Sequence, residues 1–315
     1  MYFDCILFYF CETHEFKRSN FYRMLVTTTA TKFLKRKNTL NLNGRILELA
    51  QPVVMGIINV TPDSFFDGGK YKTDKKVVKR AEEILDQGGT IIDIGAVSTQ
   101  PGKEGISTKD EIDRLLPAVK AIKKEFPDAF LSIDTYRSWV ALKIIEECGP
   151  CIVNDVSGGN FDVHMFDTIG KLGVPYILMH MQGTPLKMQE NPVYEDIIRD
   201  ISLFFTESVK QLTKAGVKDV IIDPGFGFGK LLEHNYELLN RLDSFKVFQL
   251  PLLVGVSRKG MIHKLLGSNP DEALNGTTVV NTLALMGGAD ILRVHDVREA
   301  VEAVRIMNMV RSTSK

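Results

Sequence analysis

The sequence predicts an α/β protein, a single (β/α)8 TIM barrel with an N-terminal β-hairpin. Short apolar segments alternate with helical patterns eight times between residues 52 and 310, at about 32 residues a unit, which is typical of such barrels. Polar or ionisable residues follow every apolar segment at the point where it ends. The alternative is a doubly wound open sheet, which rarely needs eight regular units.

Composition bounds the protein class but not its chemistry. The 315 residues hold 39 basic and 39 acidic side chains, and 44% of residues are hydrophobic. This balance argues against nucleic-acid binding, which favours a basic excess. The sequence has no apolar run long enough to cross a membrane. With only four cysteines, no disulfide framework is expected, so we expect a cytoplasmic protein.

Residues 1–38 differ from the rest of the chain. The segment 1–23 is rich in aromatics without a clear period, and 24–38 is rich in Thr. The apolar stretch 5–11 is too short to span a bilayer, and no small-residue cleavage site follows it. We interpret 1–38 as a leader, either disordered or preceding a true start at or after Met24, and 39–315 as the barrel domain.

The first regular element is a hairpin at 39–49. Apolar and polar residues alternate there around Asn43-Gly44, a strong short-range hairpin signal. We expect this hairpin to plug the N-terminal end of the barrel.

The eight units then follow in order, each strand being a nearly continuous apolar run as expected for parallel strands buried on both faces. The predicted strands are 53–60, 90–95, 130–134, 152–156, 175–180, 220–223, 252–256 and 290–294. The predicted helices are 74–87, 109–125, 138–148, 163–172, 196–215, 231–241, 272–286 and 298–310. Glycines follow five of the helices, where a C-cap glycine is favoured.

Hydrogen-bond acceptors gather at three of the strand ends, where barrel active sites lie. Asp134, Asn154 and Asp223 offer carboxylates and an amide, which suit a planar heterocycle with several N–H donors. Their ordinary structural alternatives are a helix cap for Asp134 and, for the neighbouring Asp155, a brace of the turn.

Cationic groups gather at two other strand ends. Lys259, Arg293 and His295 offer positive charge for a phosphate or pyrophosphate. The set as a whole indicates a pyrophosphate-activated heterocyclic substrate. Two further polar residues, His180 and Asp93, have structural alternatives, a satisfied core histidine and a partner inside the barrel.

Two motifs are poor matches to better-known sites. The Cys148–Cys151 pair has CxxC spacing, but it lies at the end of a predicted helix. A redox-active CxxC motif lies at the start of a helix, because the helix N-terminus lowers the thiol pKa. The segment 225–230, GFGFGK, lacks the spacing of a phosphate-binding loop. We interpret it as a flexible rim whose Phe228 lines a pocket.

Seven motifs in order resemble the dihydropteroate synthase family over residues 40–310. They are GIINVTPDSF at 56–65, SIDTY at 132–136, NDVSG at 154–158, LMHMQG at 178–183, DPGFGFGK at 223–230, SRK at 257–259 and RVHD at 293–296. The resemblance implies a pterin-binding TIM barrel that joins 6-hydroxymethyl-7,8-dihydropterin pyrophosphate to p-aminobenzoate and releases pyrophosphate. It also implies Mg²⁺ as cofactor and a homodimer through the barrel helices.

The same resemblance implies residue roles at the matching positions. The pterin would be held by Asp134, Asn154, Met179, Asp223, Phe228, Lys259 and Arg293. The p-aminobenzoate pocket, where sulfonamides compete, would be bounded by Phe65, Thr99, Pro101 and Ser257. Arg293 and His295 would bind the pyrophosphate, Asn59 would meet Mg²⁺, and Asp67 would help to close the site. Asp67, Asp134, Asp223, Lys259, Arg293 and His295 form the expected catalytic set.

The chain departs from the family pattern beside its second strand. Gln100 stands where the family usually has Arg, and Ala96-Val97 replaces Gly-Glu. We expect weakened loop closure, with Gln100→Arg lowering the KM for p-aminobenzoate.

Three other functions remain as alternatives. A pterin-binding methyltransferase domain shares the barrel, but it has no pyrophosphate to hold with Lys259 and Arg293. An aldolase-like Schiff-base barrel would use Lys259, but Arg258 is adjacent and no acid–base pair is obvious. The third is a non-catalytic pterin-binding module.

Overall fold

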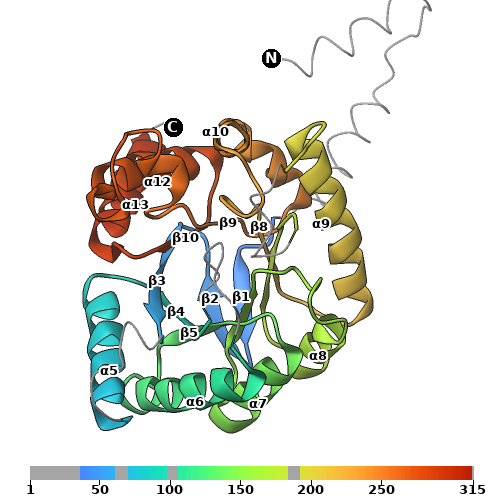
Figure 1. Ribbon diagram of the computed structural model, residues 1–315, viewed down its shortest axis with the longest axis vertical. Coiled ribbons are helices and arrows are strands. Elements are labelled where there is room, and N and C mark those ends of the chain that lie inside the picture. The colour runs from blue at the N-terminus through green and yellow to red at the C-terminus, as the bar shows by residue number, and fades with distance from the viewer. Residues whose placement is uncertain (1–35, 61–69, 98–105, 184–191, 314–315) are drawn as a thin grey trace, which may run out of the picture. The chain divides into compact units, whose positions relative to one another are not determined.

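The strands form a parallel barrel, seen end-on in Figure 1. The computed structural model describes residues 36–60, 70–97, 106–183 and 192–313, with side chains of the first helix from Lys75 onward. Eight parallel strands lie in these ranges, in the order β8-β7-β6-β5-β4-β3-β10-β9, and a bridge between Ile222 and Leu252 links the two outermost strands. They are β3 (Val53–Asn59), β4 (Ile91–Gly95), β5 (Phe130–Asp134), β6 (Ile152–Asp155), β7 (Tyr176–Met179), β8 (Val220–Asp223), β9 (Leu253–Val254) and β10 (Ile291–Val294). The predicted barrel is confirmed.

A ring of helices surrounds these strands (Figure 1). The eight predicted helices are present as α5 (Lys70–Asp86), α6 (Thr108–Glu125), α7 (Ser138–Cys148), α8 (Met165–Leu172), α9 (Ile197–Lys214), α10 (Leu232–Asn240), α12 (Leu274–Gly287) and α13 (Val297–Thr313). Three short elements were not predicted: η1 (Leu242–Phe248), α11 (Gly260–His263) and η2 (Pro270–Glu272). None of the helices in the described ranges has the length and apolar content needed to cross a membrane.

Both faces of each strand are covered, which explains the continuous apolar runs in the sequence. In β4, Ile92 and Ile94 face outward and belong to the main core between strands and helices. Ile91 faces the barrel interior and belongs to a second apolar cluster. Asp93 lies on the same inward side one step further along β4, and it is fully buried. The barrel interior therefore changes from apolar to charged along its axis.

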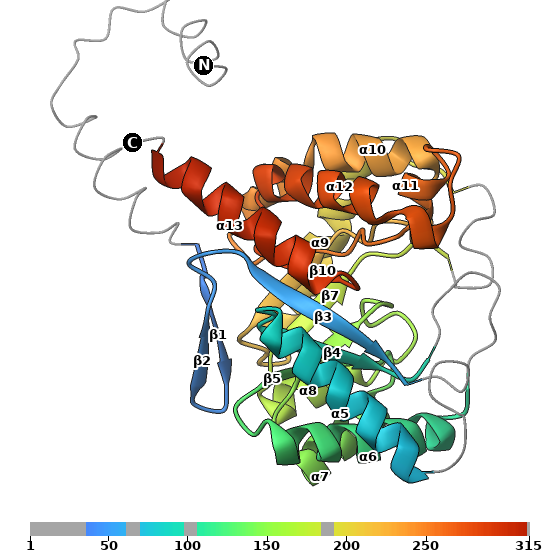
Figure 2. The same ribbon diagram turned by 90° about the vertical axis from the view of Figure 1, so that its left-hand side faces the viewer.

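The hairpin consists of β1 (Thr39–Leu42) and β2 (Arg45–Glu48), paired antiparallel around Asn43 and Gly44. Both turn residues have positive φ, 50° and 92°, as a type I′ turn requires. Its inward leucines are packed against the first inward side chain of the strands in one cluster: Leu40, Leu42, Leu47, Leu49, Met55, Ile91, Ile152, Ile177, Ile221, Leu253 and Ile291. Figure 2 shows the hairpin beyond the starting end of β3. The predicted plug is confirmed.

Strand β9 is shorter than predicted, with two residues where the apolar run 252–256 suggested five. The backbone turns directly after it, because Lys259 N donates to Val256 O at 3.1 Å. Arg258 sits in that turn with φ 56°. Apolar composition continued past the strand because Val256 is buried in the turn.

Candidate active site

Strand register brings several of the predicted residues to one rim of the barrel. Asn59 pairs with Gly95, Gly95 with Asp134, and Asp134 with Asn154. A side chain at position 95 would crowd this rim, since a Cβ there would lie 3.3 Å from the Asp134 Cβ. Glycine at position 95 therefore leaves enough space for the Asp134 carboxylate.

A buried ion-pair network joins β4, β5 and β10 at this rim. Arg293 Nε donates to Asp93 Oδ2 at 2.7 Å, and Arg293 Nη2 donates to Asp134 Oδ2 at 2.7 Å. Asn154 Nδ2 donates to the same Asp93 oxygen at 3.2 Å. Asp93 is fully buried, so its role as a partner inside the barrel, which the sequence left open, is confirmed.

The charges in this network shift one another's protonation. Burial raises the pKa of Asp134 to about 7, opposed by Arg293 and reinforced by the carboxylates of Asp93 and Glu111. Burial disfavours the charged form of Arg293, but the carboxylates of Asp93 and Asp134 outweigh it and raise the pKa of the guanidinium. Arg293 is thus a permanent cation, whereas Asp134 titrates near neutral pH.

A second pair of opposite charges lies at the ends of β8 and β9. Asp223 Oδ1 accepts from Gly225 N at 2.8 Å, and burial raises the pKa of its carboxyl, opposed chiefly by Lys259. Burial lowers the pKa of Lys259 to about 8, with Asp223 acting against the shift. Lys259 Nζ donates to Phe226 O.

Apolar side chains lie beside these charges, as predicted. Met179 is in one small cluster with Val156 and Met181, and the half-buried Phe228 is packed against it. The Nζ of Lys259 lies 4.5 Å from the centroid of the Phe228 ring, a cation–π contact. The arrangement provides flat apolar walls with charged groups at their edge.

His295 is exposed on the rim, two residues after Arg293. Its N donates to Ser257 Oγ at 3.2 Å, and its O accepts from Arg80 Nη2 at 2.7 Å, so the backbone is fixed on both sides. Partial removal of the ring from water and the neighbouring Arg293 charge lower its pKa. In the substrate-free protein the lowered pKa leaves the His295 ring neutral at pH 7, and its binding of pyrophosphate stays a prediction. The ring is neutral until an anion raises its pKa.

Arg258 is a structural residue that holds the turn carrying Lys259. Its Nε and Nη2 donate to the two oxygens of Asp296 at 2.9 and 2.8 Å. Its backbone N donates to Thr277 Oγ1 at 3.1 Å.

Two of the open structural alternatives are resolved by hydrogen bonds. Asp134 is not the cap of α7, because the backbone N of Ser138 donates instead to Asp162 Oδ2 at 2.7 Å. Asp155 braces its turn, accepting from Ser157 N and from Tyr176 OH, both at 2.7 Å.

Two buried charged residues were missed by the sequence reasoning. Glu111 of α6, 1% exposed, forms an ion pair with Arg137, which follows β5, and no sequence signal pointed to it. Lys230, 2% exposed, follows the glycine-rich loop, and its Nζ lies 3.1 Å from His180 Nδ1. The interpretation of that loop as a flexible rim is wrong, because side-chain hydrogen bonds hold its backbone at both ends and in its middle.

Some predicted site residues lie outside the described residues. They are Phe65, Asp67, Thr99 and Pro101, together with the departure at Gln100. Cys148 and Cys151 are described and unpaired, and burial raises the pKa of both thiols, to about 11 for Cys151.

Comparison with known proteins decides the family. A model described as pterin binding enzyme matches residues 55–295. The dihydropteroate synthase of Escherichia coli (strain K12) is 43% identical over 274 residues, which are 86% of this chain and 96% of that protein. This chain belongs to the dihydropteroate synthase family.

Two solved structures of that family superpose closely on this chain. The Yersinia pestis dihydropteroate synthase with a sulfonamide drug complex has TM-score 0.82 and 42% identity, covering 87% of this chain and 99% of that one. The Xanthomonas albilineans enzyme with 4-aminobenzoic acid has TM-score 0.80 and 35% identity, covering 87% and 98%. The resemblance of the seven motifs is confirmed, and the methyltransferase and aldolase alternatives lose their support.

Proposed function

We propose that this protein, a transferase of folate biosynthesis, joins 6-hydroxymethyl-7,8-dihydropterin pyrophosphate to p-aminobenzoate, giving 7,8-dihydropteroate and pyrophosphate. The observation that carries this proposal is the network in which Arg293 meets two buried carboxylates at the strand ends. This network places carboxylates, which suit the N–H groups of a pterin ring, next to a guanidinium, which suits a pyrophosphate. Family membership supplies the reaction.

The pterin ring would lie between Met179 and Phe228, with its N–H groups toward the carboxylates of Asp134 and Asp223. Asn154 adds an amide at the same edge. Ring N–H donors fit these acceptors because buried carboxylates otherwise lack enough partners. Lys259 would donate to the ring from the side of Phe228, where its Nζ already lies.

Binding of the pyrophosphate would change the partners of Arg293. In the substrate-free protein its guanidinium neutralises both Asp93 and Asp134. Arg293 would keep Asp93, which is fully buried, and turn its remaining donors to the phosphate oxygens. Asp134 would then be free to accept from the pterin. His295, neutral beforehand, would gain a proton beside the anion and donate to it.

We further propose Mg²⁺ as the cofactor, with Asn59 as its protein ligand. Asn59 is exposed at the end of β3, and its amide oxygen is a hard donor of the kind Mg²⁺ accepts. No group of three or more His, Cys, Asp or Glu side chains suited to a metal lies among the described residues. When bound, Mg²⁺ neutralises charge on the leaving pyrophosphate.

The reaction would proceed by loss of pyrophosphate and then attack by the amine. Departure leaves a cation at the exocyclic methylene that the ring delocalises, and the carboxylates of Asp134 and Asp223 stabilise it electrostatically. The neutral aniline nitrogen then forms a bond to the methylene and gives up one proton to solvent or to the released pyrophosphate, so no covalent enzyme intermediate is needed. Phe65, Thr99, Pro101 and Ser257 would bound the p-aminobenzoate site, where sulfonamides would compete, and Asp67 would help to close it.

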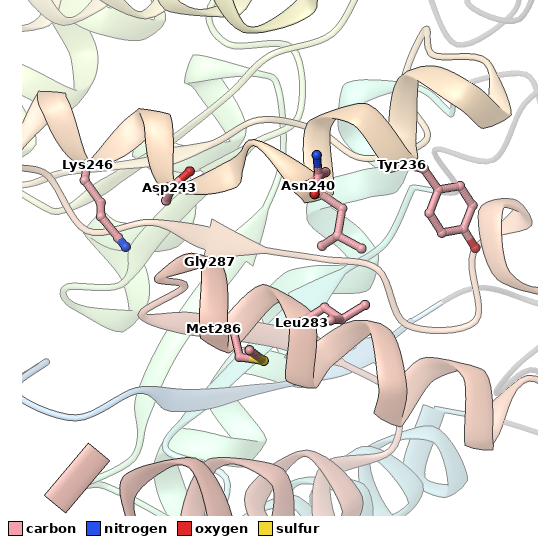
Figure 3. Close-up of a pocket in the computed structure, with 8 residues that line it drawn as sticks. Tyr236, Asn240, Asp243, Lys246, Leu283, Met286 and Gly287 are labelled. Atoms are coloured by element: carbon pink, nitrogen blue, oxygen red, sulfur yellow. The ribbon is translucent and has the colours of Figure 1, made fainter. Parts of the chain in front are cut away.

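We propose a homodimer through α12 and α13. These neighbouring helices expose large apolar side chains that a second copy would cover: Val279, Leu283, Met286, Ile306, Met309 and Val310. A groove of about 460 Å³ between α10, η1 and α12 continues this face, lined by Leu283, Met286, Lys246 and Asp243 (Figure 3). Leu283→Glu should convert dimers to monomers in analytical ultracentrifugation, and an unchanged mass would refute this interface.

The proposed location is the cytoplasm, where Cys148 and Cys151 would remain reduced.

The deciding experiment for the function is pyrophosphate release. It should require both the pterin pyrophosphate and p-aminobenzoate, and a sulfonamide should inhibit it competitively with p-aminobenzoate. Pterin binding without release would favour the non-catalytic module instead. Lys214→Met, which changes an exposed lysine near the end of α9, is the matched surface control and should retain full release.

A further inference from the structure

Lys230 is a buried lysine that the reaction as proposed does not use, and burial lowers the pKa of its ammonium to about 7, opposed by Asp223. Only 2% of the residue is exposed, and a buried ammonium is destabilising unless its hydrogens are bonded. Its Nζ donates to Gly225 O at 2.9 Å and to Phe228 O at 3.1 Å, and lies 3.1 Å from His180 Nδ1. The three hydrogens of the protonated ammonium therefore have two carbonyl oxygens and the His180 nitrogen within reach.

This geometry fixes the state of His180. When Lys230 is protonated, His180 Nδ1 accepts from it, and the ring is then neutral with its proton on Nε2. Burial and the Lys230 charge both lower the pKa of His180, in agreement with a neutral ring. The ring is held by edge-to-face packing on Phe204, with centroids 5.2 Å apart, and by Tyr194 at 6.1 Å.

The loop that Lys230 holds lies directly against the end of β7. Gly225 and Gly229 have φ of 70° and 63°, and a Cβ on Gly225 would lie 1.9 Å from the carbonyl oxygen of His180. Only glycine permits this approach. Two other side chains complete the attachment: Asn235 Oδ1 accepts from Gly227 N at 2.7 Å, and Tyr194 OH donates to Gly229 O at 2.8 Å.

The position of this loop decides where two pterin-pocket groups lie. Phe228 is part of the loop and packs on the cluster of Met179. Lys259 Nζ donates to Phe226 O in the same loop and lies over the Phe228 ring. A shift of the loop backbone would therefore move an apolar wall and a cation of the pocket together.

We propose that Lys230 is a positioning residue of the pterin site, whose ammonium, held by Gly225 O, Phe228 O and His180, fixes the loop that places Phe228 and Lys259. The proposal rests on the proposed function, since the pocket it organises is the pterin pocket. Lys230 itself would touch neither substrate.

The test is Lys230→Met, which keeps the length of the side chain and removes its three donors. The KM for the pterin pyrophosphate should rise about tenfold or more, the size expected for losing hydrogen bonds to a charged group, while the KM for p-aminobenzoate stays within about twofold. Lys230→Arg should recover part of the loss because a guanidinium keeps donors. Lys214→Met should leave both constants unchanged. An unchanged pterin KM in Lys230→Met, or an equal rise in both constants, would overturn the proposal.

A second variant keeps the test decisive if Lys230→Met does not fold. His180→Phe preserves the ring packing on Phe204 and Tyr194 but removes one acceptor, so the pterin KM should rise by a smaller factor, about threefold. Nitrogen-15 NMR should show His180 as the Nε2–H tautomer in the wild type. A mixture of tautomers there would contradict the predicted bond to Lys230.

Failure of the function itself is separable from failure of this inference. Titration calorimetry with 6-hydroxymethylpterin measures pterin affinity without turnover. If the wild type binds the pterin but releases no pyrophosphate, the function fails while Lys230→Met still tests the positioning role. Equal pterin affinities of wild type and variant would then refute that role.

Discussion

The two ends of the barrel are built on opposite principles. At the starting end, four leucines of the hairpin and the first inward residues of the strands make a wholly apolar cluster. At the other end, the inward positions of the same strands carry Asp93, Asp134, Asp223 and Arg293, held by mutual charge and hydrogen bonds. The inward-facing side chain changes from apolar to charged over two positions of a strand, as from Ile91 to Asp93 in β4.

This contrast teaches that stability and chemistry are separated along the barrel axis. Burial of apolar surface is non-directional and strengthens folding wherever it occurs. Paired buried charges contribute little net stability, but they hold defined positions for a ligand. Substitutions at one end should therefore alter stability and those at the other should alter activity.

The largest expected effect is that of Asp223→Asn at the charged end. The new amide oxygen keeps the acceptor for Gly225 N, but the negative charge beside the developing cation is lost. We expect kcat/KM to fall by roughly 10²–10³-fold, with the free energy of unfolding changed by less than about 1 kcal/mol. Steady-state kinetics and urea denaturation measure the two. A large loss of stability with little loss of activity would break the contrast.

Leu40→Ala should give the converse result at the plug. Leu40 is fully buried, so its truncation leaves a cavity and should reduce the free energy of unfolding by about 2–5 kcal/mol. Because the hairpin lies at the opposite end of the barrel from the proposed substrate site, kcat at 25 °C should remain within about twofold of the wild type. Ile46→Ala is the matched control, since this hairpin residue is 52% exposed. It should change stability by less than about 0.5 kcal/mol.

The pH dependence sharpens the description of the charged end. Activity should rise as Asp134 ionises near its pKa of about 7 and fall as Lys259 loses its proton near about 8. The Asp134 carboxyl has a higher pKa folded than unfolded, so the native state holds the extra proton between pH of about 4 and 7. Its contribution to stability therefore declines as pH rises through that window.

Asp134→Asn should remove the rising limb of the residual activity and flatten this part of the stability curve. A profile with the same rising limb in the variant would assign that limb to another group. Plots of kcat/KM and of the urea midpoint between pH 4 and 9 supply both readings.

The smallest effect is expected for Cys148→Ser. The pKa of the Cys148 thiol is raised by burial, so it is a poor nucleophile, and its CxxC partner Cys151 is fully buried. Activity should be the same within about 1.5-fold in the wild type and the variant, with or without a reductant. Reductant-dependent activity in the wild type that disappears in the variant would reveal redox control.

Local sequence patterns were enough for the elements of the fold. Asn43-Gly44 predicted the hairpin and its turn, and the apolar runs predicted all eight strands. The same runs overestimated β9, because buried residues such as Val256 continue into a turn. Polar residues at strand ends predicted the rim that carries Asp134, Asn154 and Asp223.

The partners within the site could not be predicted, because they depend on register and burial. Arg293 and Asp93 are 200 residues apart in sequence, and the pairing of β3 with both β4 and β10 brings them together. The neutral state of His295 follows from partial removal of its ring from water and from the neighbouring charge of Arg293, which residue type alone does not reveal. Lys230 reads as an ordinary loop lysine until the chain folds over it.

Asp93 has a consequence for how this protein can diverge. One oxygen of its carboxylate accepts from both Arg293 and Asn154, two residues on strands that do not adjoin each other. A substitution at any one of these three positions removes a hydrogen-bond partner of the others, so we expect substitutions at the three positions to occur together. The barrel end that holds the pterin is therefore expected to evolve in rare coordinated steps, while the helices around it change one residue at a time.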